Sequence, residues 1–181
     1  MIRLFVAIDF PTKVRRRLAD MAGGIPGARW TDEAQMHLTL RFIGEVEEPL
    51  LPDIAEALRL VRLPAFELGL EGIGSFGKLR QARVLWAGVK PSDGLAQLQG
   101  KIETVLHDLI EPESRKFHPH VTIARLKKPP PDRLGTFLAA HDAFASEPFE
   151  VGEFHLYSSF LGQGGAIHTI EATFPLERSG K

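Results

Sequence analysis

The strongest constraint on the fold of this chain is a short pattern that occurs twice, as His37-Leu38-Thr39-Leu40 and as His120-Val121-Thr122-Ile123. Side chains in a strand alternate between its two faces, so in each copy the imidazole and the hydroxyl lie on one face and the apolar residues on the other. Each copy therefore predicts a strand that is buried on one side and polar on the other. Because the copies stand in opposite halves of the chain, we expect two such strands to face each other across a groove.

The remaining segments predict an α+β fold. Alternating or short apolar runs predict strands at 2–9, 36–44, 66–73, 84–89, 149–157 and 166–174, and helical spacing of apolar residues predicts helices near 12–21, 49–61, 93–110 and 132–141. A similar order of elements recurs around each motif. We therefore expect two pseudo-symmetric lobes, each a mostly antiparallel sheet with outer helices, and an active-site groove between the sheets. Residues 1–181 are expected to form a single domain of two intimate lobes.

Charge and cysteine content limit the function classes. Lys and Arg number 22 and Asp and Glu 23, giving a net charge of −1, which argues against a protein that coats long duplexes by charge alone. The absence of cysteine excludes thiol nucleophiles, disulfides and Cys-ligated zinc. The N-terminal segment becomes charged too early for a signal peptide, and no apolar run reaches membrane-spanning length. We expect a cytoplasmic monomer with no membrane partner.

Two further patterns suggest cofactors, and both are weak. Residues 72–77 match G-x-G-x-x-G, but that fingerprint needs a helix directly after the glycines, and a strand pattern follows here. These glycines are predicted to be turn residues. His118 and His120 could share a metal ion, but no Asp or Glu lies at short ligand spacing, and the first motif would remain unexplained. We therefore expect neither a cofactor nor a metal.

Two histidines on facing strands suit acid-base chemistry at phosphorus. Imidazole titrates near neutral pH, so one ring can hold a proton while the other is ready to accept one. In-line displacement at a phosphodiester needs these two groups on opposite sides of the phosphate. Thr39 and Thr122 can donate hydrogen bonds to the non-bridging oxygens. The motifs thus predict a metal-free phosphodiesterase, but they leave open which histidine is the acid.

The motifs and their flanks resemble the 2H phosphoesterase superfamily, and within it the RNA 2′,3′-cyclic phosphodiesterases, also called 2′-5′ RNA ligases. The similar blocks are Leu4-Phe5-Val6-Ala7-Ile8, 37–44, 83–89, 119–125, Leu156-Tyr157-Ser158-Ser159 and Phe174-Pro175-Leu176. The resemblance implies hydrolysis of RNA 2′,3′-cyclic phosphate ends to 2′-phosphates, with possible reverse 2′-5′ ligation. It also implies that His37 is the proton donor and His120 the proton acceptor. One departure is Ile167-His168, where we would expect an aromatic residue.

Five further residues are candidates for substrate binding. Arg41 shares the face of the first motif if the strand is regular, although a salt bridge beside the groove is an equal alternative. Arg125 matches the arginine that follows the second motif in the family, but its parity places it on the opposite face unless the strand contains a bulge. Trp30, Phe76 and Tyr157 could stack on a base, and each could instead pack in the core.

Two other functions stay open. A nucleotide- or RNA-binding module of the same fold would not need turnover, although both histidines are retained here. A phosphodiesterase acting on small cyclic nucleotides is the other alternative. The expected partners are RNA ends or short oligonucleotides that carry a 2′,3′-cyclic phosphate.

Overall fold

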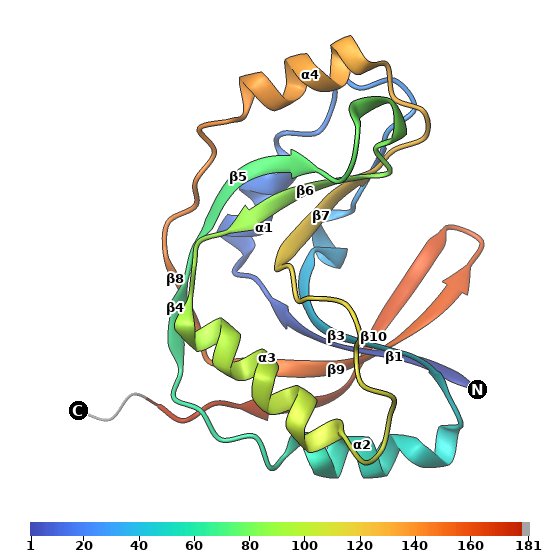
Figure 1. Cartoon of the computed structure of the whole chain (residues 1–181), viewed down its shortest axis with the longest axis vertical. Coiled ribbons are helices and arrows are strands. Elements are labelled where there is room, and N and C mark those ends of the chain that lie inside the picture. The colour runs from blue at the N-terminus through green and yellow to red at the C-terminus, as the bar shows by residue number, and fades with distance from the viewer. Residues whose placement is uncertain (179–181) are drawn as a thin grey trace.

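A computed structural model of the chain, which describes residues 1–178, contains two four-stranded antiparallel sheets with helices on their outer sides (Figure 1). The first sheet has the order β10-β9-β1-β3, with β1 at Ile2–Asp9, β3 at His37–Val46, β9 at Glu153–Gly162 and β10 at Gly165–Pro175. The second has the order β2-β7-β6-β5, with β2 at Arg29–Trp30, β5 at Leu70–Ser75, β6 at Val84–Val89 and β7 at His120–Arg125. A short ribbon pairs β4 (Phe66–Leu68) with β8 (Phe149–Val151).

The helices are α1 (Thr12–Ala19), α2 (Leu51–Leu58), α3 (Asp93–Leu106) and α4 (Pro131–Ala140), and the short 3₁₀ turns are η1 (Glu33–Gln35), η2 (Glu48–Leu50) and η3 (Leu79–Gln81). Apolar residues three or four apart give α2 and α3 the buried stripes that cover the first sheet. Helix α4 lies over the second sheet at the other end of the molecule (Figure 1). Among the described residues, no helix combines the length and apolar character that crossing a bilayer requires.

The predicted α+β architecture is confirmed, with several boundary errors. The strands expected over 66–73 and 149–157 are each divided in two, and the second and third helices end at Leu58 and Leu106, earlier than expected. Gly72 and Gly74 lie within β5 and are not turn residues. The sequence at 177–181 predicts a frayed tail, but the amide of Glu177 donates to the carbonyl of Leu63. Residues 179–181 of this segment lie outside the described part of the chain.

Both motif strands contain a bulge directly after the threonine. Ala7 pairs with Thr39 and Val6 with Arg41, so Leu40 is an extra residue in β3. Trp86 pairs with Thr122 and Leu85 with Ala124, so Ile123 is an extra residue in β7. A bulge places two successive side chains on the same face and reverses the alternation beyond it. Both strands therefore change parity one residue after the motif threonine.

Neither sheet is built from a continuous stretch of chain. Strand β2, which lies between β1 and β3 in sequence, belongs to the second sheet, whereas β9 and β10 return to the first. The β9–β10 hairpin extends beyond the last pair with β1, Arg3–Ser159, and we call its projecting part, residues 160–168, the arm. The arm reaches back toward the other lobe, since the side-chain amide of Gln35 donates to the carbonyl of Ala166. The guanidinium of Arg29 lies beside Gly165, 3.1 Å from where a Cβ would stand.

Candidate active site

The same backbone contact fixes both motif histidines. Nδ1 of His37 lies 2.7 Å from the carbonyl oxygen of Gln35, and Nδ1 of His120 lies 2.7 Å from that of His118. A carbonyl oxygen can only accept, so each Nδ1 carries a proton. Each Nε2 is therefore the nitrogen that can accept a proton from the neutral ring or donate one from the charged ring.

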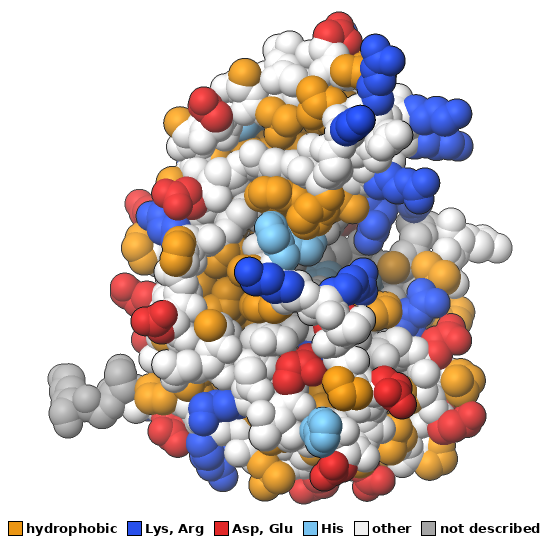
Figure 2. Space-filling view, in the orientation of Figure 1, with side chains coloured by type: hydrophobic (Ala, Val, Ile, Leu, Met, Phe, Trp, Pro, Cys, Tyr) orange, Lys and Arg blue, Asp and Glu red, His pale blue; other side chains and the backbone are white. Residues whose placement is uncertain are grey.

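The two motif strands meet where the sheets approach each other. Strand β3 of the first sheet contacts β7 of the second, which brings the two histidine-threonine faces to one region. Thr39 and Thr122 are half-buried and precede the bulges, so each shares the face of its histidine. Figure 2 shows the surface hollowed between the two halves of the molecule, with histidine side chains at its mouth.

His37 stands in a cluster of rings on the inner face of the first sheet. Its ring centroid lies 4.9 Å from that of Phe5, 5.3 Å from His168 and 6.2 Å from Tyr157. Tyr157 is stacked on Phe5, with an interplanar angle of 8° and a centroid separation of 5.0 Å. Because Phe5 covers that face of the tyrosine and only 9% of Tyr157 is exposed, Tyr157 supports the cluster and does not offer this face to a base.

This setting controls the protonation of His37. Burial lowers the pKa of His37 to about 4; the hydrogen bond to Gln35 and the charge of Asp9 oppose this, and His168 adds to it. Burial also lowers the pKa of His168 and raises that of Tyr157 to about 12. In the free protein at neutral pH, His37 is therefore an uncharged ring. A bound anion would raise its pKa, because a neighbouring negative charge favours the protonated form.

His120 belongs to a different cluster of rings. The ring of Phe76, which is 41% exposed, lies 5.1 Å from His120, 5.2 Å from His118 and 5.5 Å from Trp86, measured between centroids. The Trp86 ring lies directly over Gly74, where an added Cβ would stand 2.5 Å from Cη2 of the indole. Gly74 is thus needed for close approach of this ring. Phe76 remains a candidate for stacking on a base, since it is exposed beside His120.

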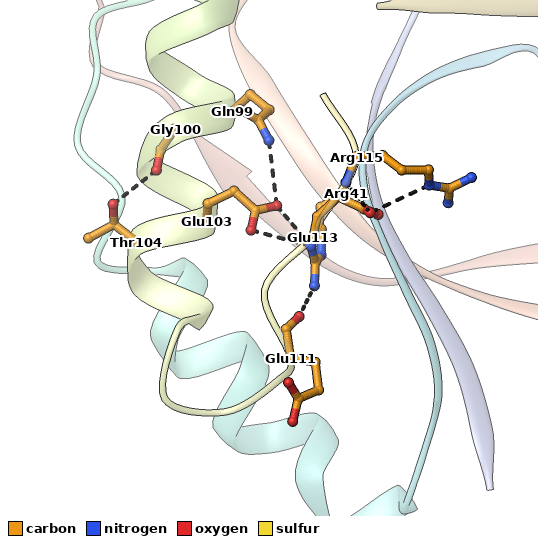
Figure 3. Close-up of polar contacts among 8 residues, drawn as sticks. All are labelled: Arg41, Gln99, Gly100, Glu103, Thr104, Glu111, Glu113 and Arg115. Atoms are coloured by element: carbon orange, nitrogen blue, oxygen red, sulfur yellow. Dashed lines mark hydrogen bonds and ion pairs between the residues drawn. The ribbon is translucent and has the colours of Figure 1, made fainter. Parts of the chain in front are cut away.

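Arg41 does not share the face of His37, and this expectation is wrong. The bulge at Leu40 turns Arg41 toward the helices, where the side chain is only 6% exposed. Its Nη1 donates to both carboxylate oxygens of Glu103 on α3, at 3.2 and 3.3 Å, and its Nη2 donates to the carbonyl of Glu111 (Figure 3). The alternative, a salt bridge, describes this residue, although the bridge is buried under the sheet.

The second bulge has the opposite consequence for Arg125. With Ile123 as the extra residue, Ile123 and Ala124 are both buried and Arg125 is exposed, on the side of Thr122. The equivalent position after the first motif is Phe42, which is 51% exposed. Trp30 pairs with Ala124 and packs on Phe137 of α4, 5.5 Å between centroids, so it faces away from the groove.

Several residues of the site were not identified from the sequence. Phe5 is the centre of the first ring cluster, and His168 joins it from the arm. Phe5 has a sequence signal, because it alternates with the core residues Leu4 and Val6 of β1 and must face the groove. His168 stood out in the sequence only as a departure from the family pattern, because its place beside Phe5 depends on the register of β10 against β9.

Comparisons with known proteins find similar sequences over most of the chain. The model of the 2′-5′ RNA ligase superfamily matches residues 10–161. The RNA 2′,3′-cyclic phosphodiesterase of Thermotoga maritima is 35% identical over 175 residues, which cover 93% of this chain and 92% of that protein. That of Archaeoglobus fulgidus is 30% identical over 170 residues, covering 92% of this chain and 96% of the relative.

Solved structures show the same fold. The crystal structure of TT0787 of Thermus thermophilus superposes with a TM-score of 0.82 at 28% identity and covers 98% of this chain and 100% of that one. Escherichia coli LigT complexed with 3′-AMP superposes with a TM-score of 0.75 at 27% identity, over 97% of this chain and 98% of LigT.

Proposed function

The chain belongs to the 2′-5′ RNA ligase superfamily, and from this premise we propose that it hydrolyses 2′,3′-cyclic phosphate ends of RNA to 2′-phosphates. The observation that carries the proposal is the matched pair of histidines. Both rings are held through Nδ1 by the carbonyl two residues earlier, on strands that contact each other. Two Nε2 atoms are thereby available to one phosphate, one for each side of the phosphorus.

In the proposed reaction, Nε2 of His120 takes a proton from a water molecule, and the water oxygen forms a bond to phosphorus. The bond from phosphorus to the ribose 3′ oxygen breaks, and that oxygen receives a proton from Nε2 of His37. The products are a 2′-phosphate and a free 3′ hydroxyl. Thr39 and Thr122 donate hydrogen bonds to the non-bridging oxygens, where negative charge develops.

If His37 is the acid, binding of the substrate must raise its pKa. With its pKa lowered to about 4, His37 is neutral in the free protein at pH 7 and has no proton to give from Nε2. The negative charge of the cyclic phosphate beside the ring would raise this pKa and stabilise the imidazolium. Substrate binding would thus protonate His37 and enable it to act as the acid. The roles implied by the family, with His37 as proton donor and His120 as proton acceptor, would then hold.

The same groups serve a ligation reaction. A 5′ hydroxyl can replace water as the group that His120 deprotonates, and attack on the cyclic phosphate then gives a 2′-5′ linkage. No further residue is required, so we propose ligation as a secondary activity of this site, in keeping with the superfamily to which the chain belongs.

The test uses a short RNA with a 2′,3′-cyclic phosphate end, incubated in EDTA with wild type, His37→Ala, His120→Ala and the control His107→Ala. His107 is exposed at the C-terminal end of α3 and belongs to neither motif strand. We expect the 2′-phosphate product with wild type and the control, and its loss in both motif variants.

Other results would change the assignment. Binding of the RNA end without turnover would favour a nucleotide-binding module. Turnover of 2′,3′-cyclic AMP alone would favour small cyclic nucleotides as substrates. Activity abolished by EDTA would mean that a metal ion takes part.

A further inference from the structure

Beside the groove, five cationic residues lie on adjoining backbone segments, and we call them the cationic strip: Arg29, Arg83, Arg125, Lys127 and Lys128. Strand pairing sets Arg29 opposite Arg125, and the amide of Leu126 donates to the carbonyl of Arg83 at 2.8 Å. Lys127 and Lys128 follow Arg125 after the buried Leu126. All five are exposed. In Figure 2, Lys and Arg side chains gather at the upper right of the view and extend down toward the histidines of the groove.

The strip is not neutralised by the protein itself. Within residues 1–178, none of its five side chains forms an ion pair or a hydrogen bond, whereas Arg3, Lys13 and Arg15 are each paired with a carboxylate. The chain as a whole has a net charge of −1. The strip is therefore a local cluster of positive charge on a nearly neutral protein. Like charges in such a cluster repel one another unless an anion binds.

Lys128 provides an independent indication. Its φ of 45° is the only positive value at a non-glycine residue in the described part of the chain. This left-handed region suits glycine and is strained for lysine. The chain keeps a cation at a position where glycine would be the less strained choice, which indicates that the charge there is used.

We infer that the cationic strip binds the phosphates of the RNA strand upstream of the reacting end, so that a longer strand binds better than a dinucleotide with the same end. This rests on the proposed function, which places the terminal phosphate at the motif threonines. Because of the bulge in β7, Arg125 follows Thr122 on the same side, so the strip begins beside the proposed phosphate site. A single phosphate cannot occupy five cations spread over two strands and two connecting segments, whereas successive phosphates of one RNA strand can.

The experiment compares two substrates with the same 3′ nucleotides and a 2′,3′-cyclic phosphate: a dinucleotide and a single-stranded 12-mer. We expect wild type to prefer the 12-mer. In Lys127→Glu/Lys128→Glu, kcat/KM for the 12-mer should fall by about 10- to 100-fold, with the value for the dinucleotide changed by less than about threefold. The dependence of log kcat/KM on log salt concentration should also become shallower, by roughly 0.7 per lost phosphate contact.

Two further variants separate phosphate binding by the strip from effects of net charge and of stability. Arg62→Glu/Lys101→Glu makes the same change of net charge beside α2 and on α3, and should leave both substrates unaffected. Lys128→Gly removes one charge and relieves the strained φ, so its Tm should be equal to or higher than that of wild type while the 12-mer reacts more slowly.

Equal kcat/KM for both substrates in wild type, unaffected by the strip variants, would overturn the inference and leave the proposed function intact. If wild type turned over neither substrate, the proposed function would fail, and anisotropy with a labelled 12-mer ending in a 2′-phosphate would still decide on the strip. Loss of affinity only in the strip variants would support it. Competition by polyglutamate as strong as by RNA would assign the surface to an acidic protein and overturn it.

Discussion

The two lobes hold their histidines in the same way and surround them differently. In each, Nδ1 is bonded to the carbonyl two residues earlier, a threonine follows on the same face, and a bulge follows the threonine. Beyond that the lobes diverge: His37 is packed among Phe5, Tyr157 and His168, whereas the contact of His120 with His118 is exposed. The repeated backbone contact fixes where the ring nitrogens point, and the burial of the first ring lowers the pKa of His37.

The largest effect on kcat is expected from removing each motif histidine, which tests whether the two lobes act in the same chemical step. His37→Ala and His120→Ala should each lower kcat by about 10²- to 10⁴-fold, as for the loss of a general acid or base. The double variant should be no more than about tenfold slower than the weaker single variant, because groups acting as one unit are not additive. Single-turnover kinetics measures this. Fully additive losses would mean that the histidines act in separate steps.

The position four residues after each histidine gives the next contrast, Arg41 against Ala124. Arg41→Ala should lower the free energy of unfolding by about 2–4 kcal/mol, because Glu103 loses its partner in a half-buried setting. Urea denaturation measures the loss, and Glu103→Gln serves as the companion variant. Activity per folded molecule should stay within about twofold of wild type. A large loss of kcat with unchanged stability would place Arg41 at the substrate after all.

The next position contrasts Arg125 with Phe42. Arg125→Ala should lower kcat/KM by about 10- to 100-fold, as expected from losing a hydrogen bond to a charged group worth about 1.5–3 kcal/mol. Since Arg125 is exposed, the free energy of unfolding should change by less than about 0.5 kcal/mol. Arg125→Lys is the control, because it keeps the positive charge but lacks the planar guanidinium that can donate two parallel hydrogen bonds. Arg41 and Arg125 would thus show opposite profiles, one structural and one functional.

The smallest effect concerns the proton affinity of His37. In the free protein, NMR titration should find its pKa at about 4, and binding of 2′-AMP should move the pKa upward. His168→Phe should also move it upward, since a neighbouring imidazolium disfavours a second one. A pKa that stays low in the complex would argue that His37 is the base and would reverse the proposed roles.

The same pKa has a consequence for stability. His37 binds its proton less readily in the folded chain than at its usual pKa of 6.5, so the unfolded state takes up more protons as the pH falls from 6.5 toward about 4. The contribution of His37 to the free energy of unfolding is therefore complete above pH 6.5 and declines across that window. Urea denaturation at several pH values, compared with His37→Phe, measures this contribution.

The sequence predicted the motif strands, their faces as far as the threonines, and the α+β class, because these depend on local alternation. The prediction failed at Arg41 because strict alternation assumes that each residue of a strand pairs with one residue of its neighbour. An extra residue such as Leu40 becomes visible only when the pairing of β3 with β1 is known. The same argument left Arg125 dependent on a bulge, which is present. For Trp30 the sequence left both stacking and packing open, because its strand has only two residues and therefore no alternation to read. His168 depended on the path of the arm.

The interleaving of the two sheets also has a consequence for when activity can appear as the chain is made. His37 and His120 have both emerged before β9 and β10, yet those last strands form half of the first sheet and carry Tyr157 and His168. Pairings between residues so distant in sequence are slow to form. We expect a chain ending at Gly152 to contain both motifs and no working site. Synthesis would then have to be nearly complete before the protein could act on any RNA, including the message that encodes it.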